Sequence, residues 1–182
     1  MNILASAGQL RASFLRWALV IVPVIVLLGI LSSQLGNPNS QWFQGLVKPA
    51  IYPPPATFGI VWIVLYVLMG LALALVCGAR GAAGRGVAVG MFGIQLLLNL
   101  AWSPLFFGMH RISQALYLLL ALDLAVLATT ALFWRVRPRA GLLLLPYFAW
   151  VCFATVLNWQ FLELNRASDG QPYAVKRIEI GP

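Results

Sequence analysis

Polar and aromatic side chains recur at helical spacing inside long apolar stretches of the sequence. Gln95, Asn99 and Trp102 stand at positions i, i+4 and i+7, so a helix would present them on one face. An amide in an apolar helix needs a hydrogen-bond partner, which either a neighbouring helix or the polar edge of a ligand supplies. Two other stripes add aromatic rings, and they consist of Phe58, Trp62 and Tyr66, and of Tyr147, Trp150, Ala154 and Leu157.

Each stripe alone is explained by packing between helices, but three stripes together favour a cavity. Binding sites between helices combine apolar walls with a few placed polar groups, and these stripes contain both. Pro104 and Pro146 interrupt two of the apolar stretches, and a proline inside a helix frees the carbonyl one turn back. We therefore expect kinks, a free carbonyl near Leu100, and room for a ligand inside a helical bundle.

Asp123 is the only carboxylate near the middle of an apolar stretch. A charge at that depth is costly, so an acidic residue there is a candidate for function. The alternative is a neutral carboxyl group that bridges helices or lies near a pocket floor without touching the ligand. The sequence offers Tyr147 or Asn158 as its partner.

Conventional catalytic chemistry has no residues to carry it. The chain contains one histidine, His110, and two cysteines, Cys77 and Cys152, without metal-ligand spacing. It also lacks a serine–histidine–acid set, paired carboxylates and a phosphate-binding loop. We predict no catalytic residue, no metal site and no cofactor. Nucleic acid is excluded as a partner, because no basic face with interleaved aromatic residues is visible.

The elements that position these side chains must lie in a lipid bilayer. Of the 182 residues, 62% are hydrophobic and only 9% are charged, and the mean hydropathy is +0.90, whereas a soluble domain carries about 25% charged residues. The apolar runs lack period-two alternation and approach the roughly 20 residues that cross the hydrocarbon core, which favours helices over a barrel. We predict an all-α integral membrane protein, in which one domain over residues 1–165 is a bundle of five transmembrane helices at 17–31, 56–78, 87–107, 114–134 and 140–163.

The long connector 32–55 is predicted to lie over one end of this bundle. It contains Trp42-Phe43, Lys48-Pro49 and Pro53-Pro54-Pro55, and because proline fixes φ, we expect its end to be ordered and extended. Trp42 and Phe43 suit either a short helix that forms a lid or a plain anchor in the aromatic belt. The polar tail 166–182 is expected to be exposed and poorly ordered.

Basic residues cluster in the connectors beside the apolar stretches, and the formal net charge is +8. One side of the predicted bundle collects Arg11, Arg16, Arg80, Arg85, Arg135, Arg137 and Arg139, and the other collects Lys48, Arg111, Arg166, Lys176 and Arg177. The positive-inside rule then predicts, in a plasma membrane, that the N-terminus is inside and the C-terminus outside. The sequence leaves open which membrane holds the protein.

Gly86, Gly90 and Gly93 give the third predicted span a face of small residues. Such a face lets two helices approach closely and drives association in membranes. We predict a homodimer through this face, and the alternative is internal packing against the first or fourth span.

Several motifs occur in the order found in a known family. They are Trp42-Phe43, Leu46, Lys48-Pro49, Pro53-Pro54, Phe58, Trp62, Leu65-Tyr66, Gln95-x-x-x-Asn99-x-x-Trp102-Ser103-Pro104-x-Phe106-Phe107-Gly108, Pro146-Tyr147-x-x-Trp150 and Leu157-Asn158. Over about residues 36–165 the chain resembles the tryptophan-rich sensory protein / translocator protein (TspO/MBR) family, also called the peripheral-type benzodiazepine receptor family.

The resemblance implies a five-helix bundle, often a homodimer, with an internal pocket for tetrapyrroles such as protoporphyrin IX and, in some members, sterols or isoquinoline carboxamides. Carried over by position, it implies that the pocket residues are Trp42, Phe43, Trp62, Asn99, Trp102, Trp150, Ala154 and Leu157. The motifs and stripes add Phe58, Tyr66, Gln95, Phe106, Asp123 and Tyr147 to the candidate ligand-binding residues. Lys48 or Arg111 near the pocket mouth could meet a propionate, although Lys48 is also explained by snorkelling to the interface.

The sequence departs from the family pattern in three places. Ala50-Ile51 and Pro55-Ala56 stand where the family usually has bulkier or aromatic residues, so the long connector offers fewer stacking surfaces. Trp159 stands where the sterol motif needs tyrosine, and Arg166 lies too far along, so sterol binding by that motif is not supported.

The resemblance thus implies a membrane receptor or transport-type protein that binds a tetrapyrrole or another hydrophobic ligand, with a role in tetrapyrrole regulation or stress signalling. The alternative is an enzyme that degrades bound porphyrin in light and uses the pocket tryptophans as electron donors.

Overall fold

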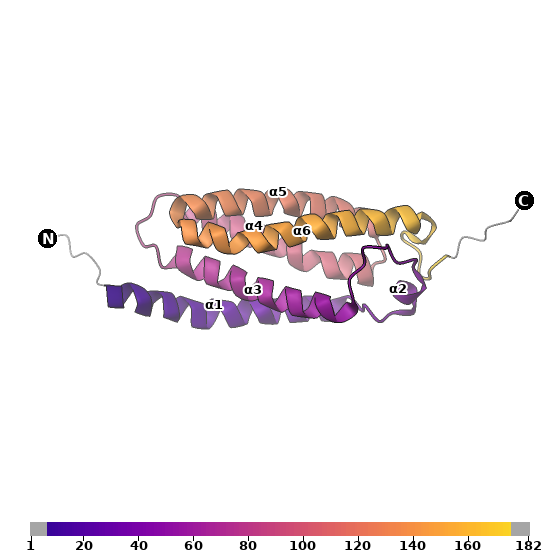
Figure 1. Cartoon of the computed structure of the whole chain (residues 1–182), viewed down its shortest axis with the longest axis horizontal. Helices are drawn as coiled ribbons and strands as arrows, with labels where there is room; N and C mark the ends of the chain where they lie inside the picture. Colours follow the sequence, from indigo (N-terminus) through magenta and orange to yellow (C-terminus); the bar gives the residue numbers. More distant parts are fainter. Residues whose placement is uncertain (1–6, 176–182) are drawn as a thin grey trace, which may run out of the picture.

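The structure is a computed structural model that describes residues 7–175. Its elements are α1 (Ala7–Leu35), α2 (Gln41–Gly45), α3 (Pro55–Cys77), α4 (Arg85–Ser103), the π-helical turn η1 (Pro104–Gly108), α5 (Ile112–Val136), α6 (Pro138–Leu164) and the 3-10 turn η2 (Arg166–Ser168). The five long helices lie along one another in an elongated bundle, and short α2 lies across one end (Figure 1).

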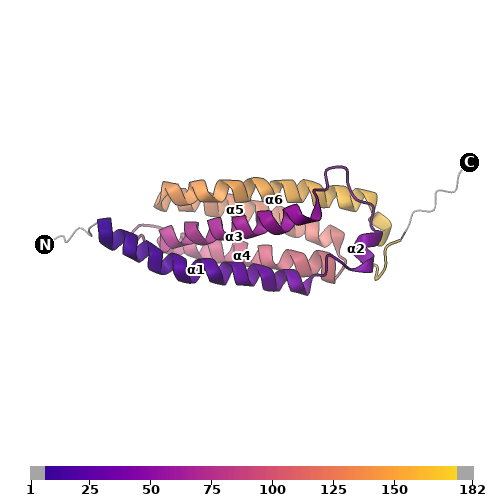
Figure 2. The same cartoon turned by 60° about the horizontal axis from the view of Figure 1, so that its bottom comes forward.

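The helices follow the order α1, α3, α6, α5 and α4 around the bundle. Each packs along the next over much of its length, whereas α4 makes only a narrow contact with α1. Figure 2 shows α1 and α3 side by side, with the connector that holds α2 at the end of the bundle opposite the N-terminus. Four of the five interfaces between neighbouring helices are therefore extensive, and the interface between α1 and α4 is narrow.

All five long helices are long and apolar enough to cross a membrane, which confirms the predicted bundle. The chain is a multi-pass integral membrane protein. The first span is predicted at 17–31, and the helix that contains it, α1, runs from Ala7 to Leu35. Exposed Arg11 and Arg16 can reach water from the helix start, and at its other end Ser32 and Ser33 bond to backbone carbonyls.

The proline in the third span acts as predicted. Pro104 has no N–H to donate to the carbonyl of Leu100, and the Ser32 hydroxyl of α1 donates to that carbonyl at 2.6 Å instead. The chain then widens into η1, where the N–H of Met109 bonds to the carbonyl of Pro104 at 2.9 Å. One hydrogen bond thus joins α1 to α4 at the point where the α-helix ends.

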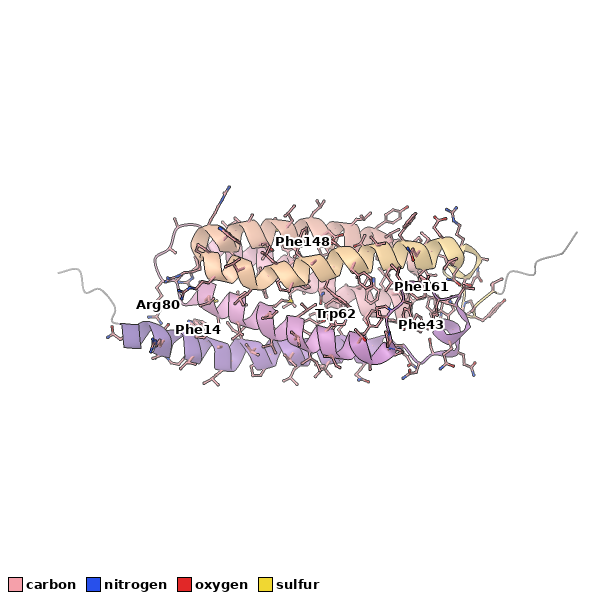
Figure 3. All side chains as sticks on the ribbon, in the orientation of Figure 1. Phe14, Phe43, Trp62, Arg80, Phe148 and Phe161 are labelled. Carbon is pink, nitrogen blue, oxygen red and sulfur yellow. The ribbon has the colours of Figure 1, made fainter. Side chains whose placement is uncertain are left out.

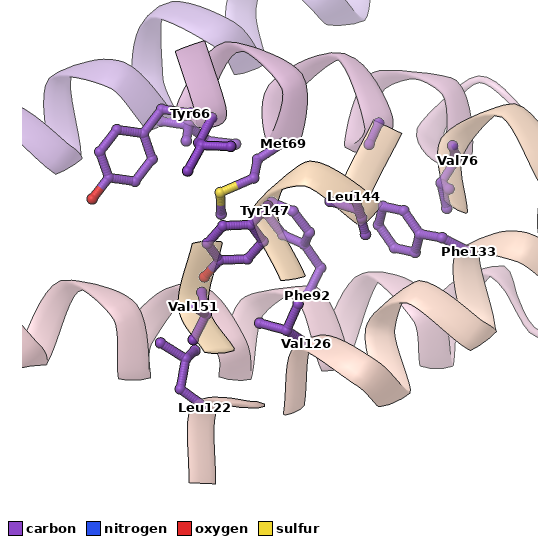
Figure 4. Packing of buried hydrophobic residues seen from close by; sticks show 14 of the residues in the cluster. Tyr66, Met69, Val76, Phe92, Leu122, Val126, Phe133, Leu144, Tyr147 and Val151 are labelled. Carbon is purple, nitrogen blue, oxygen red and sulfur yellow. The ribbon is translucent and has the colours of Figure 1, made fainter. Parts of the chain in front are cut away.

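The core differs between the two halves of the bundle. The half nearer the start of α1 is filled by interlocking aliphatic and aromatic side chains, among which Met69, Phe133 and Tyr147 are completely buried (Figure 4). The half nearer α2 holds a cluster of rings that includes Trp42, Phe43, Phe106 and Phe161. Figure 3 places Phe43 and Phe161 at this end and Arg80 at the other. Most of the predicted site residues gather in the α2 half, whereas Tyr147 belongs to the filled half.

The long connector carries a short helix that is part of the core. The hydroxyl of Ser40 accepts a hydrogen bond from the N–H of Phe43 at 3.2 Å and caps α2. Trp42 and Phe43 are only 3% and 6% exposed, so they form a lid and are not anchors in the aromatic belt. Pro55 occupies the first turn of α3, where its missing N–H costs nothing.

The predicted disorder of the tail is wrong for residues 166–175. The side chain of Asn165 accepts from the N–H of Val47 at 2.8 Å and donates to the carbonyl of Val47 at 2.9 Å. Asp169 accepts from the N–H of Ser113 at the start of α5. The tail is therefore fastened to the lid and to the bundle by local polar contacts. Residues 176–182, with Lys176 and Arg177, lie outside the described residues.

Glycine lets α1 and α3 come close together. A Cβ at Gly29 would overlap the Tyr66 ring, and one at Gly70 would lie 2.9 Å from the Cα of Val22. We predict that Gly70→Leu forces the helices apart and lowers the free energy of unfolding by about 1–3 kcal/mol.

Thermal unfolding in detergent, followed by circular dichroism, measures this effect as a lower midpoint. Gly59→Leu is the matched control on the same helix, because a Cβ at Gly59 meets nothing within 4 Å. Equal midpoints for the two variants would contradict the close contact between α1 and α3.

Candidate ligand-binding cavity

A cavity of about 660 Å³ lies in the α2 half of the bundle, within the range of about 300–1,000 Å³ that is usual for small-molecule sites. Its walls come from α1, α3, α4, η1, α5 and α6, and the connector with α2 covers its end. The predicted residues that line it are Phe43, Phe58, Trp62, Tyr66, Asn99, Trp102, Phe106, Trp150, Ala154 and Leu157. The structure thus brings residues from five separate segments of the chain to one cavity.

Trp42 does not line the cavity. It belongs to α2 (the lid, Gln41–Gly45), and its ring packs on the side of the lid that faces away from the cavity. Its ring stacks on His110 at 4.3 Å and meets the edge of Phe106 at 5.8 Å. Its indole N–H donates to the carbonyl of Ser168 at 3.4 Å. Trp42 therefore links the lid to the tail and to η1, and it does not contribute a wall.

Gln95, Asn99 and Trp102 each bond to a different residue on another helix. The hydroxyl of Tyr147 donates to Gln95 Oε1 at 2.9 Å, and the hydroxyl of Tyr66 donates to Asn99 Oδ1 at 2.9 Å. Gln95 and Tyr147 lie outside the cavity lining, so their interaction holds α4 to α6, whereas Tyr66 and Asn99 both line the cavity.

The third interaction on this face of α4 joins three helices. The indole N–H of Trp102 donates to Asn158 Oδ1 at 3.2 Å, and Asn158 Nδ2 donates to the carbonyl of Ile112 at 3.0 Å. Asn158 of α6 thereby connects α4 to the start of α5. Asn158 also lines the cavity, and the sequence motif contained it without assigning it to the pocket.

Asp123 lies away from the cavity, and its predicted partners are wrong. Its Oδ2 accepts a hydrogen bond from the hydroxyl of Thr155 at 2.7 Å, not from Tyr147 or Asn158. Its Oδ1 has no partner among residues 7–175. The carboxyl group bridges α5 and α6, which matches the structural alternative and not a ligand contact.

Helix α1 forms one wall that the sequence patterns did not reveal. Gly29, Ser32 and Ser33 line the cavity from this helix, with Val26 and Ile30 beside them, and Gly36 lines it directly after the helix ends. Their small size is the signal that could have identified them, because small residues recur here every three to four positions. Other lining residues absent from the prediction include Tyr52, Phe107 and Phe161.

Lys48 supplies the one full charge among the described residues that line the cavity. Burial lowers the pKa of its ammonium group to about 8. Burial also raises the pKa of Tyr52, which lines the same end of the cavity and stays neutral at physiological pH. The cavity therefore has a mostly apolar interior and a basic group under its lid.

Comparison with protein-family models matches residues 19–164 to the TspO/MBR family. That range contains the lid and nearly all of the membrane-spanning helices. The chain belongs to the TspO/MBR family. The family motifs in the third span and around Pro146 correspond to the wall that Asn99, Trp102, Trp150 and Asn158 form.

Relatives within the TspO/MBR family come from bacteria and animals. The chain is 43% identical over 130 residues to the Tryptophan-rich protein TspO of Chlorobaculum tepidum, which covers 71% of this chain and 82% of the relative. It is 41% identical over 121 residues to the Translocator protein of Homo sapiens (65% and 72%). It is 38% identical over 125 residues to the Tryptophan-rich sensory protein of Cereibacter sphaeroides (69% and 77%).

We predict that Asn158→Leu destabilises the bundle by about 1–3 kcal/mol, because the indole N–H of Trp102 loses its buried acceptor. Thermal unfolding measures the loss. The same substitution in a Trp102→Phe background should cost less, since the donor is then already absent. Strictly additive losses would show that the bond between Trp102 and Asn158 does not stabilise the fold.

Proposed function

We propose that this TspO/MBR-family protein is a membrane receptor or transport-type protein that binds a tetrapyrrole, such as protoporphyrin IX, or another flat hydrophobic ligand inside the bundle. A role in tetrapyrrole regulation or stress signalling goes with this proposal. The observation that carries it is the cavity of about 660 Å³, whose walls are aromatic and whose polar groups are few.

The aromatic walls suit a large flat π-system. Trp62 stacks on Tyr66 with ring centroids 5.4 Å apart, and Trp102 stacks on Phe106 at 5.2 Å. Trp150 faces Phe58 edge-on at 5.8 Å. Each aromatic contact to a ligand is worth about 0.5–1.5 kcal/mol beyond the burial of its area, so several rings together favour a flat aromatic guest.

One buried donor in the wall supports a ligand with a hydrogen-bond acceptor. The indole N–H of Trp150 is buried and has no partner among residues 7–175. Leaving such a donor unpaired costs about 1–3 kcal/mol. An acceptor on a bound molecule would recover that free energy, whereas a purely aliphatic guest would not.

Light-driven degradation of porphyrin would use the same tryptophans as electron donors. Binding alone accounts for the arrangement of residues 7–175, so binding is the function proposed. Illumination of the loaded protein separates the two: a distinct product that depends on Trp62 and Trp150 favours the enzyme, and bleaching equal to that in empty detergent micelles favours binding.

We predict that the double variant Trp62→Phe, Trp150→Phe binds protoporphyrin IX at least about fivefold more weakly, because the two contacts together contribute about 1–3 kcal/mol. A titration in the dark, followed by porphyrin absorbance, measures the affinity. Trp159→Phe is the matched control, since Trp159 is half exposed on the outside of α6. Unchanged affinity in the double variant would show that protoporphyrin IX does not bind in this cavity.

The proposal includes a homodimer formed through α4. Gly86 and Gly90 are exposed, and a Cβ at Gly86, Gly90 or Gly93 meets nothing within 4 Å. This open space supports an intermolecular role for these glycines over internal packing. The surface is small, apolar and lipid-facing, which is the kind of face that lets a second copy approach closely in a membrane.

We predict that Gly90→Leu converts the dimer to a monomer, because the added side chain keeps the two α4 helices apart. Crosslinking in lipid nanodiscs and light scattering in detergent both report the oligomeric state. Gly59→Leu, another glycine with open space on a different helix, should leave that state unchanged. A wild-type protein that is already monomeric under both conditions would overturn the dimer.

A further inference from the structure

We propose that Lys48 forms an anion subsite under the lid, which binds a carboxylate at one end of an amphiphilic ligand while the aromatic cavity holds its apolar body. This inference rests on the proposed function in one respect only, namely that the cavity takes up a ligand. It adds the chemical class of that ligand, an organic acid with a flat or chain-like apolar part, and its orientation.

The ammonium group of Lys48 is held at the edge of the cavity by two kinds of contact, cation–π contacts and hydrogen bonds. Nζ lies 3.7 Å from the centroid of the Phe43 ring and 5.8 Å from that of Phe161, and both rings line the cavity. Nζ also donates to the carbonyl of Phe43 and, at 3.4 Å, to that of Leu46. The head group is therefore fixed at the cavity edge.

The charge on Lys48 has no counter-ion in the described part of the chain. Glu163 pairs with Arg166 at 2.6 Å on the exposed end of α6, and Asp169 caps α5 through Ser113. Asp123 bonds to Thr155 on the seam between α5 and α6. An ammonium group has three donors, and the two carbonyls occupy two of them. One donor and the full charge of Lys48 remain for an external anion.

Polarity changes along the cavity in a way that orients a ligand. Asn39, Gln44 and Tyr52 line the cavity with Lys48 from the connector and α2. The deeper walls are dominated by rings and aliphatic side chains, of which Trp62 and Leu122 are examples. A molecule with one acidic end thus satisfies Lys48 when its acid lies under the lid and its apolar body points into the bundle.

A purely structural role for Lys48 makes different predictions. In that reading its ammonium group caps the last carbonyls of α2, where a cation interacts favourably with the helix end. Removal of Lys48 would then loosen the lid and weaken every ligand equally. An anion subsite discriminates between ligands by their charge, so a comparison of an acid with its ester separates the two roles.

The experiment compares protoporphyrin IX with its dimethyl ester, in the dark, on the full chain in neutral-lipid nanodiscs. Lys48→Met should weaken binding of the acid by about tenfold or more, as expected for a charge-assisted hydrogen bond, and should change binding of the ester by less than about twofold. Lys48→Arg should restore most of the preference for the acid.

Arg111→Met is the matched control, because it removes a charge of the same sign from an exposed residue that does not line the cavity. Equal losses for acid and ester in Lys48→Met would overturn the subsite and leave Lys48 as a helix cap. Full retention of the preference for the acid in that variant would overturn it as well.

The pH dependence gives a second measurement. Because the free ammonium group has a pKa of about 8, the preference for the acid should be greatest at about pH 6–7, where the ligand's carboxyl group is already ionised, and should fall as the pH rises through 8. The preference in Lys48→Met should stay flat. The other groups near this end are Tyr52 in the cavity, His110 behind Trp42, and the pair Glu163 and Arg166. All of these groups remain in Lys48→Met, so a slope that survives there would contradict the assignment.

Failure of the proposed function remains distinguishable from failure of the subsite. If the wild-type protein binds neither porphyrin, the tetrapyrrole proposal fails. The same acid and ester comparison is then made with a fluorescent long-chain fatty acid and its methyl ester. A preference for the acid that disappears in Lys48→Met would support the subsite without the tetrapyrrole, and no such preference would overturn both.

Discussion

The hydrogen bonds along the inner face of α4 determine how the rest of the bundle is arranged. The hydrocarbon core holds no water to solvate amides, so each must find a partner within the protein. Gln95 bonds to Tyr147, Asn99 to Tyr66, and Trp102 to Asn158. These three bonds fix the rotation and depth of α3 and α6 relative to α4. The direction of the aromatic rings on all three helices follows from that arrangement.

The cavity exists because one seam of the bundle is built differently from the others. Contact between α1 and α4 depends on small residues, with Ser32 bonded to the carbonyl that Pro104 frees and Gly36 against Ser103. Neither glycine nor serine fills space, so the α2 half remains hollow while large side chains fill the other half. The proline and the small residues of α1 therefore act together, because Pro104 frees the carbonyl of Leu100 and the hydroxyl of Ser32 binds it.

The sequence predicts well what periodicity encodes and poorly what depends on long-range contacts. The five spans and the stripe of Phe58, Trp62 and Tyr66 follow from helical spacing, and each member of that stripe lines the cavity. Spacing cannot show that Trp42 points away from the cavity toward His110, or that Thr155 is the partner of Asp123. It also misses the order of the tail, because the bond from Trp42 to Ser168 joins residues 126 positions apart and the bond from Ser113 to Asp169 joins residues 56 positions apart.

Most polar side chains in the bundle form hydrogen bonds, so the few that lack a partner among residues 7–175 are candidates for contact with a ligand. Gln95 Nε2 and Asp123 Oδ1 also lack partners among residues 7–175, yet both residues lie outside the cavity lining. Trp150 and Lys48 belong to the lining, and within the described part of the chain one has an unpaired N–H while the other has an uncompensated charge. An unpaired buried donor destabilises the empty protein by about 1–3 kcal/mol. A bound molecule with an acceptor and a negative charge would satisfy both of these groups, so the cavity is better suited to being occupied than to being empty.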